Sequence, residues 1–123
     1  MADLKQILLN IVDKYDIKCI GIFGSRARGD FQDYSDYDIF MISDMTLDEE
    51  LKIEGLLEEE LGNTVDLINL KEDMDRILLK NILNDGIVFY NEDNSYEKLY
   101  KFVEDFFIEN SDFIRVRERD LID

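Results

Sequence analysis

The spacing of apolar positions predicts a helix and two strands in the first part of the chain. Residues 3–16 keep helical spacing on one face, with apolar side chains at Leu4, Ile7, Leu8, Ile11, Val12 and Tyr15. Asp3 and Gln6 resemble a capping box at the start of this helix. Residues 18–23 and 37–43 predict short strands, and the second is apolar on both faces after Asp38, as a central strand is.

Helices and strands continue to alternate along the rest of the chain. Thr46 and Glu49 form a capping box before a helix to about residue 61, and residues 64–70 predict a third strand. A helix over about 72–84 ends at Asp85-Gly86, and its inward face is assigned to Met74, Ile77, Leu78 and Ile82. Residues 87–90 predict a fourth strand, and Ser95 caps a terminal helix. This order predicts an α/β (α+β) fold with one small mixed sheet of about four strands, covered by helices.

The chain reads as a single domain over residues 1–123, with its core at about 1–90 and a C-terminal helical segment at about 95–123. Aromatic residues in that segment cover more than one helix face, which indicates either core packing or an interface for an oligomer or a partner. The N-terminus lacks a basic region, and no apolar run approaches the roughly 18 residues of a membrane span. We therefore expect a cytoplasmic protein without a membrane anchor.

Composition narrows the chemistry that the domain can perform. With 30 acidic against 14 basic residues, the net charge of −16 repels a phosphate backbone, so direct nucleic-acid binding is not expected and a basic protein partner is favoured. The chain has no histidine and only one cysteine, Cys19. Ser-His triads, imidazole metal ligands, internal disulfides and cysteine-pair zinc sites are thereby excluded. Any catalysis must rely on carboxylates and a hard metal ion.

The segment 24–38, GSRARGDFQDYSDYD, contains the residues best suited to hold a phosphate group. Gly24 and Ser25 directly follow a predicted strand, and Gly29 closes the turn. A glycine there lets the backbone approach a ligand, while exposed amides and the Ser25 hydroxyl can hold phosphate oxygens. Arg28 lies three residues after Ser25, from where its guanidinium can reach a triphosphate.

Three aspartates are candidate metal ligands and catalytic residues. Asp36 and Asp38 are two residues apart where a strand begins, so their side chains are expected on the same side. Such a pair can bridge two magnesium ions, and Asp66 on the neighbouring strand can complete the ligand set and accept the proton of an attacking hydroxyl. These residues together suit a two-metal phosphoryl-transfer site that binds a triphosphate.

Each part of this pattern is weak when it is taken alone. In a chain with about one acidic residue in four, chance gives roughly seven acid-x-acid pairs, and most Gly-Ser pairs are plain turns. The alternative interpretation is a solvated acidic loop between two strands. The joint order favours a site instead: a strand, Gly24-Ser25, then Asp36 and Asp38 on a second strand, and Asp66 on the next.

The same segment resembles the signature of the DNA polymerase beta nucleotidyltransferase superfamily, and its GSRARG…SDYD, then VDL, form is similar to the minimal nucleotidyltransferase antitoxins paired with HEPN toxins. The resemblance covers about residues 1–90 in layout. It implies magnesium and ATP, with Gly24 and Ser25 as the phosphate-holding pair, Asp36 and Asp38 as shared metal ligands and Asp66 as the third carboxylate; Arg28 matches a basic residue seen in many members. It also implies transfer of AMP to a tyrosine of the HEPN toxin.

Two other functions compete with this hypothesis. One is nucleotidyl transfer to a small molecule such as an antibiotic, for which nothing beyond residue 90 resembles a separate acceptor-binding domain. The other is a non-catalytic module that neutralises a toxin by contact alone. A pure binder has no need of three clustered like charges, so Asp36, Asp38 and Asp66 argue against the second.

Overall fold

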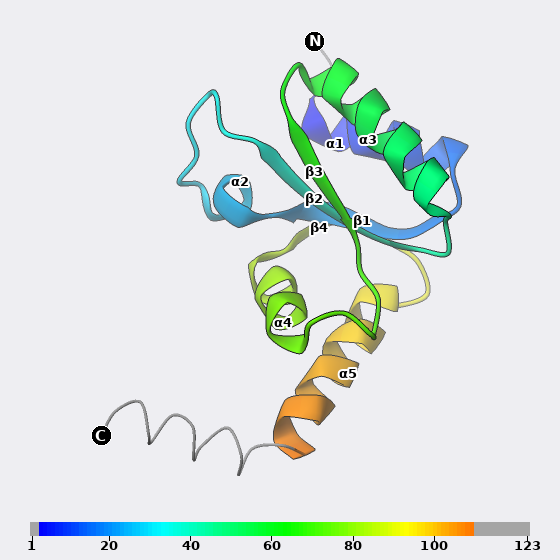
Figure 1. Ribbon diagram of the computed structural model, residues 1–123, viewed down its shortest axis with the longest axis vertical. Coiled ribbons are helices and arrows are strands. Elements are labelled where there is room, and N and C mark those ends of the chain that lie inside the picture. Colours follow the sequence, from blue (N-terminus) through cyan, green and yellow to red (C-terminus); the bar gives the residue numbers. More distant parts are fainter. Residues whose placement is uncertain (1–2, 110–123) are drawn as a thin grey trace.

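A computed structural model describes residues 3–109, which fold around one four-stranded mixed sheet with the strand order β3-β2-β1-β4 (Figure 1). β1 is antiparallel to both β2 and β4, whereas β2 and β3 are parallel. The strands are β1 (Ile17–Phe23), β2 (Tyr37–Ser43), β3 (Val65–Asn69) and β4 (Ile87–Asn91). The helices are α1 (Leu4–Lys14), α2 (Gly24–Arg28), α3 (Leu47–Leu61), α4 (Arg76–Asp85) and α5 (Ser95–Glu109). The predicted fold class, including a terminal helix, is confirmed.

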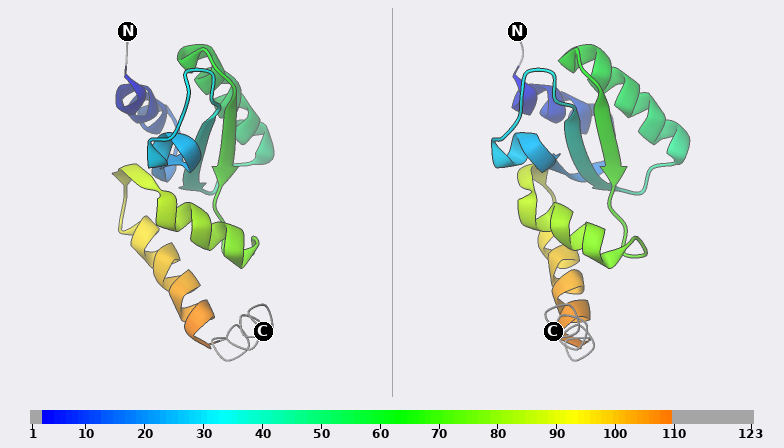
Figure 2. Two further views of the ribbon diagram at one scale, coloured as in Figure 1. Left: turned by 90° about the vertical axis from the view of Figure 1, so that its left-hand side faces the viewer. Right: turned by 60° about the vertical axis from the view of Figure 1, so that its left-hand side comes forward.

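Both faces of the sheet are covered, which divides the apolar core into two layers. Figures 1 and 2 show α1 and α3 over one face and α4 and α5 over the other. Along β2, Ile39 and Met41 point into the first layer while Phe40 points into the second. All three side chains are fully buried, because alternate residues of a strand enter opposite layers. The apolar run of the central strand is explained by this double cover.

One end of the sheet collects the residues that the sequence singles out. β1 ends at Phe23 beside Asp38 in the antiparallel pair, and Asp38 is level with Asp66 in the parallel pair. The end of β1 and the starts of β2 and β3 therefore meet at one end of the sheet, and this end of the strands is here called the sheet edge. α2 and the loop 29–36 lie beyond this edge, on the left of Figure 1.

The helix predicted over 72–84 differs from α4 in its start and its buried face. Asp75 caps the helix by accepting a hydrogen bond from the Leu78 amide at 2.9 Å, so α4 begins at Arg76. The predicted inward residues Ile77 and Leu78 are 60% and 43% exposed. Ile82, also predicted to face inward, is buried. Apolar residues surround much of this helix, and packing against β1 and α5 buries Leu79 and Leu83 with it in place of Ile77 and Leu78.

The terminal helix also departs from expectation at its start. Ser95 is the first residue of α5, and its hydroxyl donates to the Glu92 carbonyl at 2.6 Å instead of capping the helix. The part of the predicted terminal segment beyond Glu109 lies outside the described residues. Over residues 3–109, no helix is both long enough and apolar enough to cross a membrane.

The contact between Gly21 and Phe40 gives a test of the packing between β1, β2 and β4. A Cβ on Gly21 would overlap the Ile87 carbonyl oxygen and lie 2.7 Å from Phe40 Cζ. Gly21→Ala is therefore expected to lower the free energy of unfolding by about 1–3 kcal/mol, the usual cost of overpacking a core. Urea denaturation followed by circular dichroism measures the change.

Gly55→Ala is the matched control for the same chemical change. Gly55 lies in α3, and a Cβ there meets nothing within 4 Å. Alanine should raise the free energy of unfolding by roughly 0.5–1 kcal/mol, because glycine is a poor helix former. A loss of stability in both variants would contradict the close packing of Gly21.

Candidate active site

Gly24 lies directly against the carboxylate of Asp38. It follows β1 with a φ of +72°, a left-handed conformation that side chains other than glycine rarely adopt. A Cβ on Gly24 would overlap Asp38 Oδ2 and lie 3.1 Å from its Cγ. Backbone conformation and space therefore both require glycine here. The predicted phosphate-holding turn and the first predicted metal ligand are in van der Waals contact.

The parallel pairing of β2 with β3 brings Asp66 beside Asp38. Paired residues of neighbouring strands point to the same side of a sheet, and Asp38 lies level with Asp66 in this register. Both side chains share the face of Phe40, which is the face covered by α4 and α5. Asp36 lies in the loop, one residue before β2, and is exposed. The predicted aspartates thus gather at one edge of the sheet.

The carboxylates are suited to a hard cation by chemistry, although their side chains are not arranged as a preformed set. Within residues 3–109, no three acidic, histidine or cysteine side chains are grouped so that they could hold a metal ion. In the same range, Asp36, Asp38 and Asp66 make no side-chain hydrogen bond or ion pair. Asp36 and Asp66 are exposed, so both are free to rotate toward a cation. Carboxylate oxygens are the ligands that magnesium prefers.

The pKa of Asp38 is changed by partial burial and by the charged residues that surround it at this edge. Its pKa lies above the ordinary value of 3.8, first because partial burial disfavours the charged form, and then because Asp66 and Asp36 repel it. Arg28 acts in the opposite direction and lowers the pKa. The free protein therefore holds an excess of negative charge that Arg28 offsets only in part and that a bound cation would relieve.

The segment predicted as a turn, Gly24–Arg28, is one turn of helix, α2. Gly29 ends it in the left-handed conformation with a φ of 85°, and its amide donates to the Ser25 carbonyl at 2.9 Å. The Ser25 hydroxyl makes no hydrogen bond to the described residues. It remains available to a ligand beside Gly24.

Arg28 has protein partners that the sequence did not reveal. Its Nε donates to Asp30 Oδ2 at 3.3 Å, and its Nη1 donates to Asp85 Oδ2, at the end of α4, at 3.2 Å. The hydrogen bond to Asp30 is the main cause that raises the pKa of the guanidinium. The side chain is 49% exposed, and exposed pairs are weak, so an anionic ligand can compete for it.

Arg26 and Asn63 are contacts of the site that sequence reasoning missed. Both donate to the backbone carbonyls of Asp33 and Ser35, just before Asp36. Arg26 lies two positions before Arg28 in the same turn of helix, and Asn63 lies just after the end of α3. Neither position carries a distinctive sequence signal, because the contacts join residues that are 7 to 30 positions apart.

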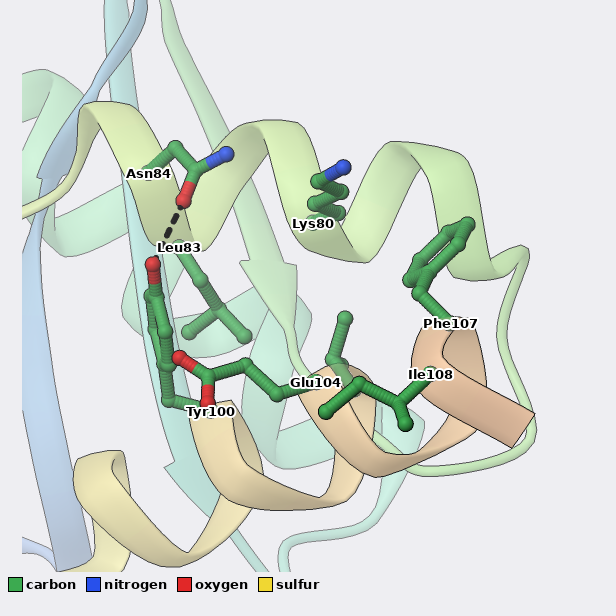
Figure 3. A pocket seen from close by; sticks show the side chains of 8 residues that line it. Lys80, Leu83, Asn84, Tyr100, Glu104, Phe107 and Ile108 are labelled. Carbon is green, nitrogen blue, oxygen red and sulfur yellow. Dashed lines mark hydrogen bonds between the residues drawn. The ribbon is translucent and has the colours of Figure 1, made fainter. Parts of the chain in front are cut away.

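An apolar groove lies apart from this edge, between α4 and α5. Figure 3 shows its lining side chains, which enclose a volume of about 300 Å³: Lys80, Leu83, Asn84, Tyr100, Val103, Glu104, Phe107 and Ile108. Part of the aromatic excess predicted for the terminal helix is therefore accounted for by packing on α4. Ile108, at the end of α5, stays 68% exposed.

Most of the chain is similar to known proteins. The family described as polymerase beta, nucleotidyltransferase, matches residues 5–95. A protein of Methanocaldococcus jannaschii, provisionally named a protein adenylyltransferase, is 36% identical over 95 residues, covering 71% of this chain and 95% of that protein.

Solved structures with similar folds have low sequence identity and are compared for fold alone. A chain in a crystal structure of a toxin–antitoxin with AMP-PNP has a TM-score of 0.78 at 18% identity, covering 98% of this chain and 100% of the other. A chain from a complex of a tri-AMPylated Shewanella oneidensis HEPN toxin with an MNT antitoxin has a TM-score of 0.65 at 16% identity, covering 96% and 99%.

The raised pKa predicts that Asp38 lowers stability at neutral pH. The folded state binds the Asp38 proton more tightly than the unfolded chain does, so stability is lost as the pH rises from 3.8 through the folded-state pKa. Asparagine cannot ionise and avoids this loss. In metal-free buffer, Asp38→Asn should therefore unfold at higher urea than wild type at pH 7, and the advantage should disappear at pH 3.

Glu59→Gln, on the exposed side of α3, controls for the loss of one negative charge elsewhere. It should show a smaller change at pH 7. An advantage of Asp38→Asn that persists undiminished at pH 3 would argue against ionisation as its cause.

Proposed function

The chain belongs to the polymerase beta nucleotidyltransferase family, and from this premise we propose that it transfers AMP from ATP to a hydroxyl group of a HEPN toxin, acting as its antitoxin. The observation that carries the proposal is the junction of Gly24, Asp38 and Asp66 at one sheet edge. A ligand held at the Gly24 backbone would have its phosphates beside the carboxylates. Only a group bound with cations is compatible with so much negative charge.

In the proposed reaction, the acceptor oxygen attacks the α-phosphorus of ATP. The bond from that phosphorus to the bridging oxygen breaks, and pyrophosphate leaves. Asp66 accepts the hydroxyl proton, a role open to it because its carboxylate has no hydrogen-bond partner in the described residues. Asp36 and Asp38 would hold two magnesium ions, and Asp66 would complete the ligand set of one. When bound, magnesium offsets the negative charge that develops on the phosphate oxygens.

The nucleotide would be held from the end of β1. Gly24 allows the close approach of a phosphate, and the Ser25 hydroxyl is free to donate to it. The first amides of a helix lack partners within the helix, which adds donors at this position. Arg28 would exchange its exposed contacts with Asp30 and Asp85 for the triphosphate.

A protein acceptor is favoured by three observations. A related protein is named as a protein adenylyltransferase, and chains with this fold occur in complexes that contain a HEPN toxin and an MNT antitoxin. The net charge of −16 favours docking to a basic protein surface. The groove between α4 and α5, with Ile108 exposed at the end of α5, offers an apolar contact surface for a partner or for a second copy of the chain.

Intact-mass measurement distinguishes the candidate acceptors. The purified chain, Mg²⁺, ATP and the HEPN protein that co-purifies with it are incubated together, with the other nucleoside triphosphates in parallel. The toxin is expected to gain mass in whole AMP units and to lose its ribonuclease activity. Stable binding without any mass change would instead indicate neutralisation by contact, and modification of an added aminoglycoside alone would indicate a small-molecule acceptor.

Asparagine substitutions test the three carboxylates in the same assay. Asp36→Asn and Asp38→Asn should abolish transfer with the fold retained, because each removes a metal ligand. Asp66→Asn should lower kcat by about 10²–10⁴-fold, the contribution of a general base, while ATP binding persists. Quench-flow or time-resolved mass measurement gives kcat, and ATP binding is followed by calorimetry.

Asp33→Asn is the matched control, because Asp33 lies in the same loop, is exposed, and contributes only its backbone carbonyl to the contacts described. Its turnover should equal that of wild type. Normal turnover in Asp36→Asn or Asp38→Asn would remove that residue from the active site.

A further inference from the structure

Arg26 holds the loop that presents Asp36, and we propose that it is a positioning residue for nucleotidyl transfer, acting through the backbone on this metal ligand. The inference rests on the proposed function. It concerns a side chain whose Nη2 donates to backbone carbonyls of the loop and not to the carboxylates themselves.

Two side chains from different parts of the chain donate hydrogen bonds to the same two backbone carbonyls. Arg26 Nη2 donates to Ser35 O at 2.8 Å and to Asp33 O at 3.4 Å. Asn63 Nδ2 donates to the same oxygens at 3.1 Å and 3.3 Å. Arg26 belongs to α2, whereas Asn63 lies between α3 and β3. The loop is therefore anchored both to α2, which follows β1, and to the segment that precedes β3.

The guanidinium of Arg26 also lies against two aromatic rings. Its Cζ lies 3.7 Å from the centroid of the Tyr37 ring and 4.6 Å from that of Phe31. These contacts use the planar, weakly hydrated face of a guanidinium, which the compact ammonium of a lysine lacks. Nε is buried with no hydrogen-bond partner within the described residues. The side chain thus gives up a hydrogen bond to hold this position.

Hydrogen bonds hold the backbone of both residues next to Asp36, Ser35 and Tyr37. Ser35 is held by Arg26 and Asn63 on one side, and the Tyr37 amide donates to the Thr64 carbonyl at 2.9 Å on the other. Asp36 itself is exposed and has no side-chain partner in the described part of the chain. Its backbone is placed while its carboxylate stays free, which suits a residue that must ligate a cation. Contacts of this supporting kind commonly change metal affinity or activity by about 10–100-fold.

The test compares Arg26→Ala and Arg26→Lys with Arg76→Ala. Arg76 is a close match: its Nη1 donates to the Met74 carbonyl at 2.8 Å, its Cζ lies 5.3 Å and 5.2 Å from the rings of Phe102 and Phe106, and its Nε is buried without a partner. It lies at the start of α4, outside the proposed machinery. Asn63→Ala serves as a second, milder variant should Arg26→Ala fail to fold.

Three readouts are expected to move together. Arg26→Ala and Arg26→Lys should lower kcat for AMP transfer by about 10–100-fold, and Asn63→Ala should lower it less. The Kd of Mn²⁺ in the presence of AMP-PNP, measured by electron paramagnetic resonance, should rise in the same order. Amide ¹⁵N relaxation of residues 33–37 should show increased motion. Arg76→Ala should leave all three at wild-type values.

Several results would overturn the inference. Full rescue by lysine would show that positive charge is sufficient, and an equal loss in Arg76→Ala would show that general destabilisation is the cause. Unchanged Mn²⁺ affinity and loop order in Arg26→Ala would remove its positioning role. If wild type itself transfers no AMP, the proposed function falls, while the Mn²⁺ and relaxation measurements still decide whether Arg26 orders the loop for cation binding.

Discussion

Two carboxylates lie level on adjacent parallel strands, Asp38 on β2 and Asp66 on β3, and partial burial together with repulsion from Asp66 raises the pKa of Asp38. Folding brings them there because both strands are held by the buried layers above and below them. Asp38 also packs against Gly24, so the end of β1 is part of the same arrangement. The chain belongs to the polymerase beta nucleotidyltransferase family, and a cost of this kind is usual where charged groups are gathered at a functional site.

At this edge the backbone is held in place, whereas the carboxylates of Asp36 and Asp66 are not. The backbone is tightly specified: Gly24 is required by its φ and by the space beside it, and the loop before Asp36 is held through its carbonyls. The carboxylates of Asp36 and Asp66 are exposed and have no protein partners in the described residues. A site arranged in this way can adapt its ligands to a bound cation without moving the scaffold. Within residues 3–109 the side chains form no ready-made metal cluster, although their backbone positions converge.

The remaining helices connect the edge to a separate surface. Arg28 joins α2 to Asp85 at the end of α4, and Tyr100 donates to Asn84 Oδ1 at 2.9 Å, which ties α5 to the same end. α4 and α5 then enclose the apolar groove in Figure 3. The groove is thus connected through α4 to the edge where the proposed nucleotide site lies.

Much of this protein was determined by local sequence. Apolar periodicity, with capping residues such as Thr46, predicted the strands and most helix boundaries, because these depend on interactions within a few residues. The placement of Gly24 and Ser25 directly after one strand, and of Asp36 and Asp38 at the start of the next, predicted that these residues lie at one edge of the sheet. Tertiary structure alone decided which face of α4 is buried, since its apolar residues surround much of the helix and only packing on β1 and α5 selects among them. It also decided the contacts of Arg26, Arg28 and Asn63, because a long polar side chain can reach many partners and the fold alone determines which of them are near.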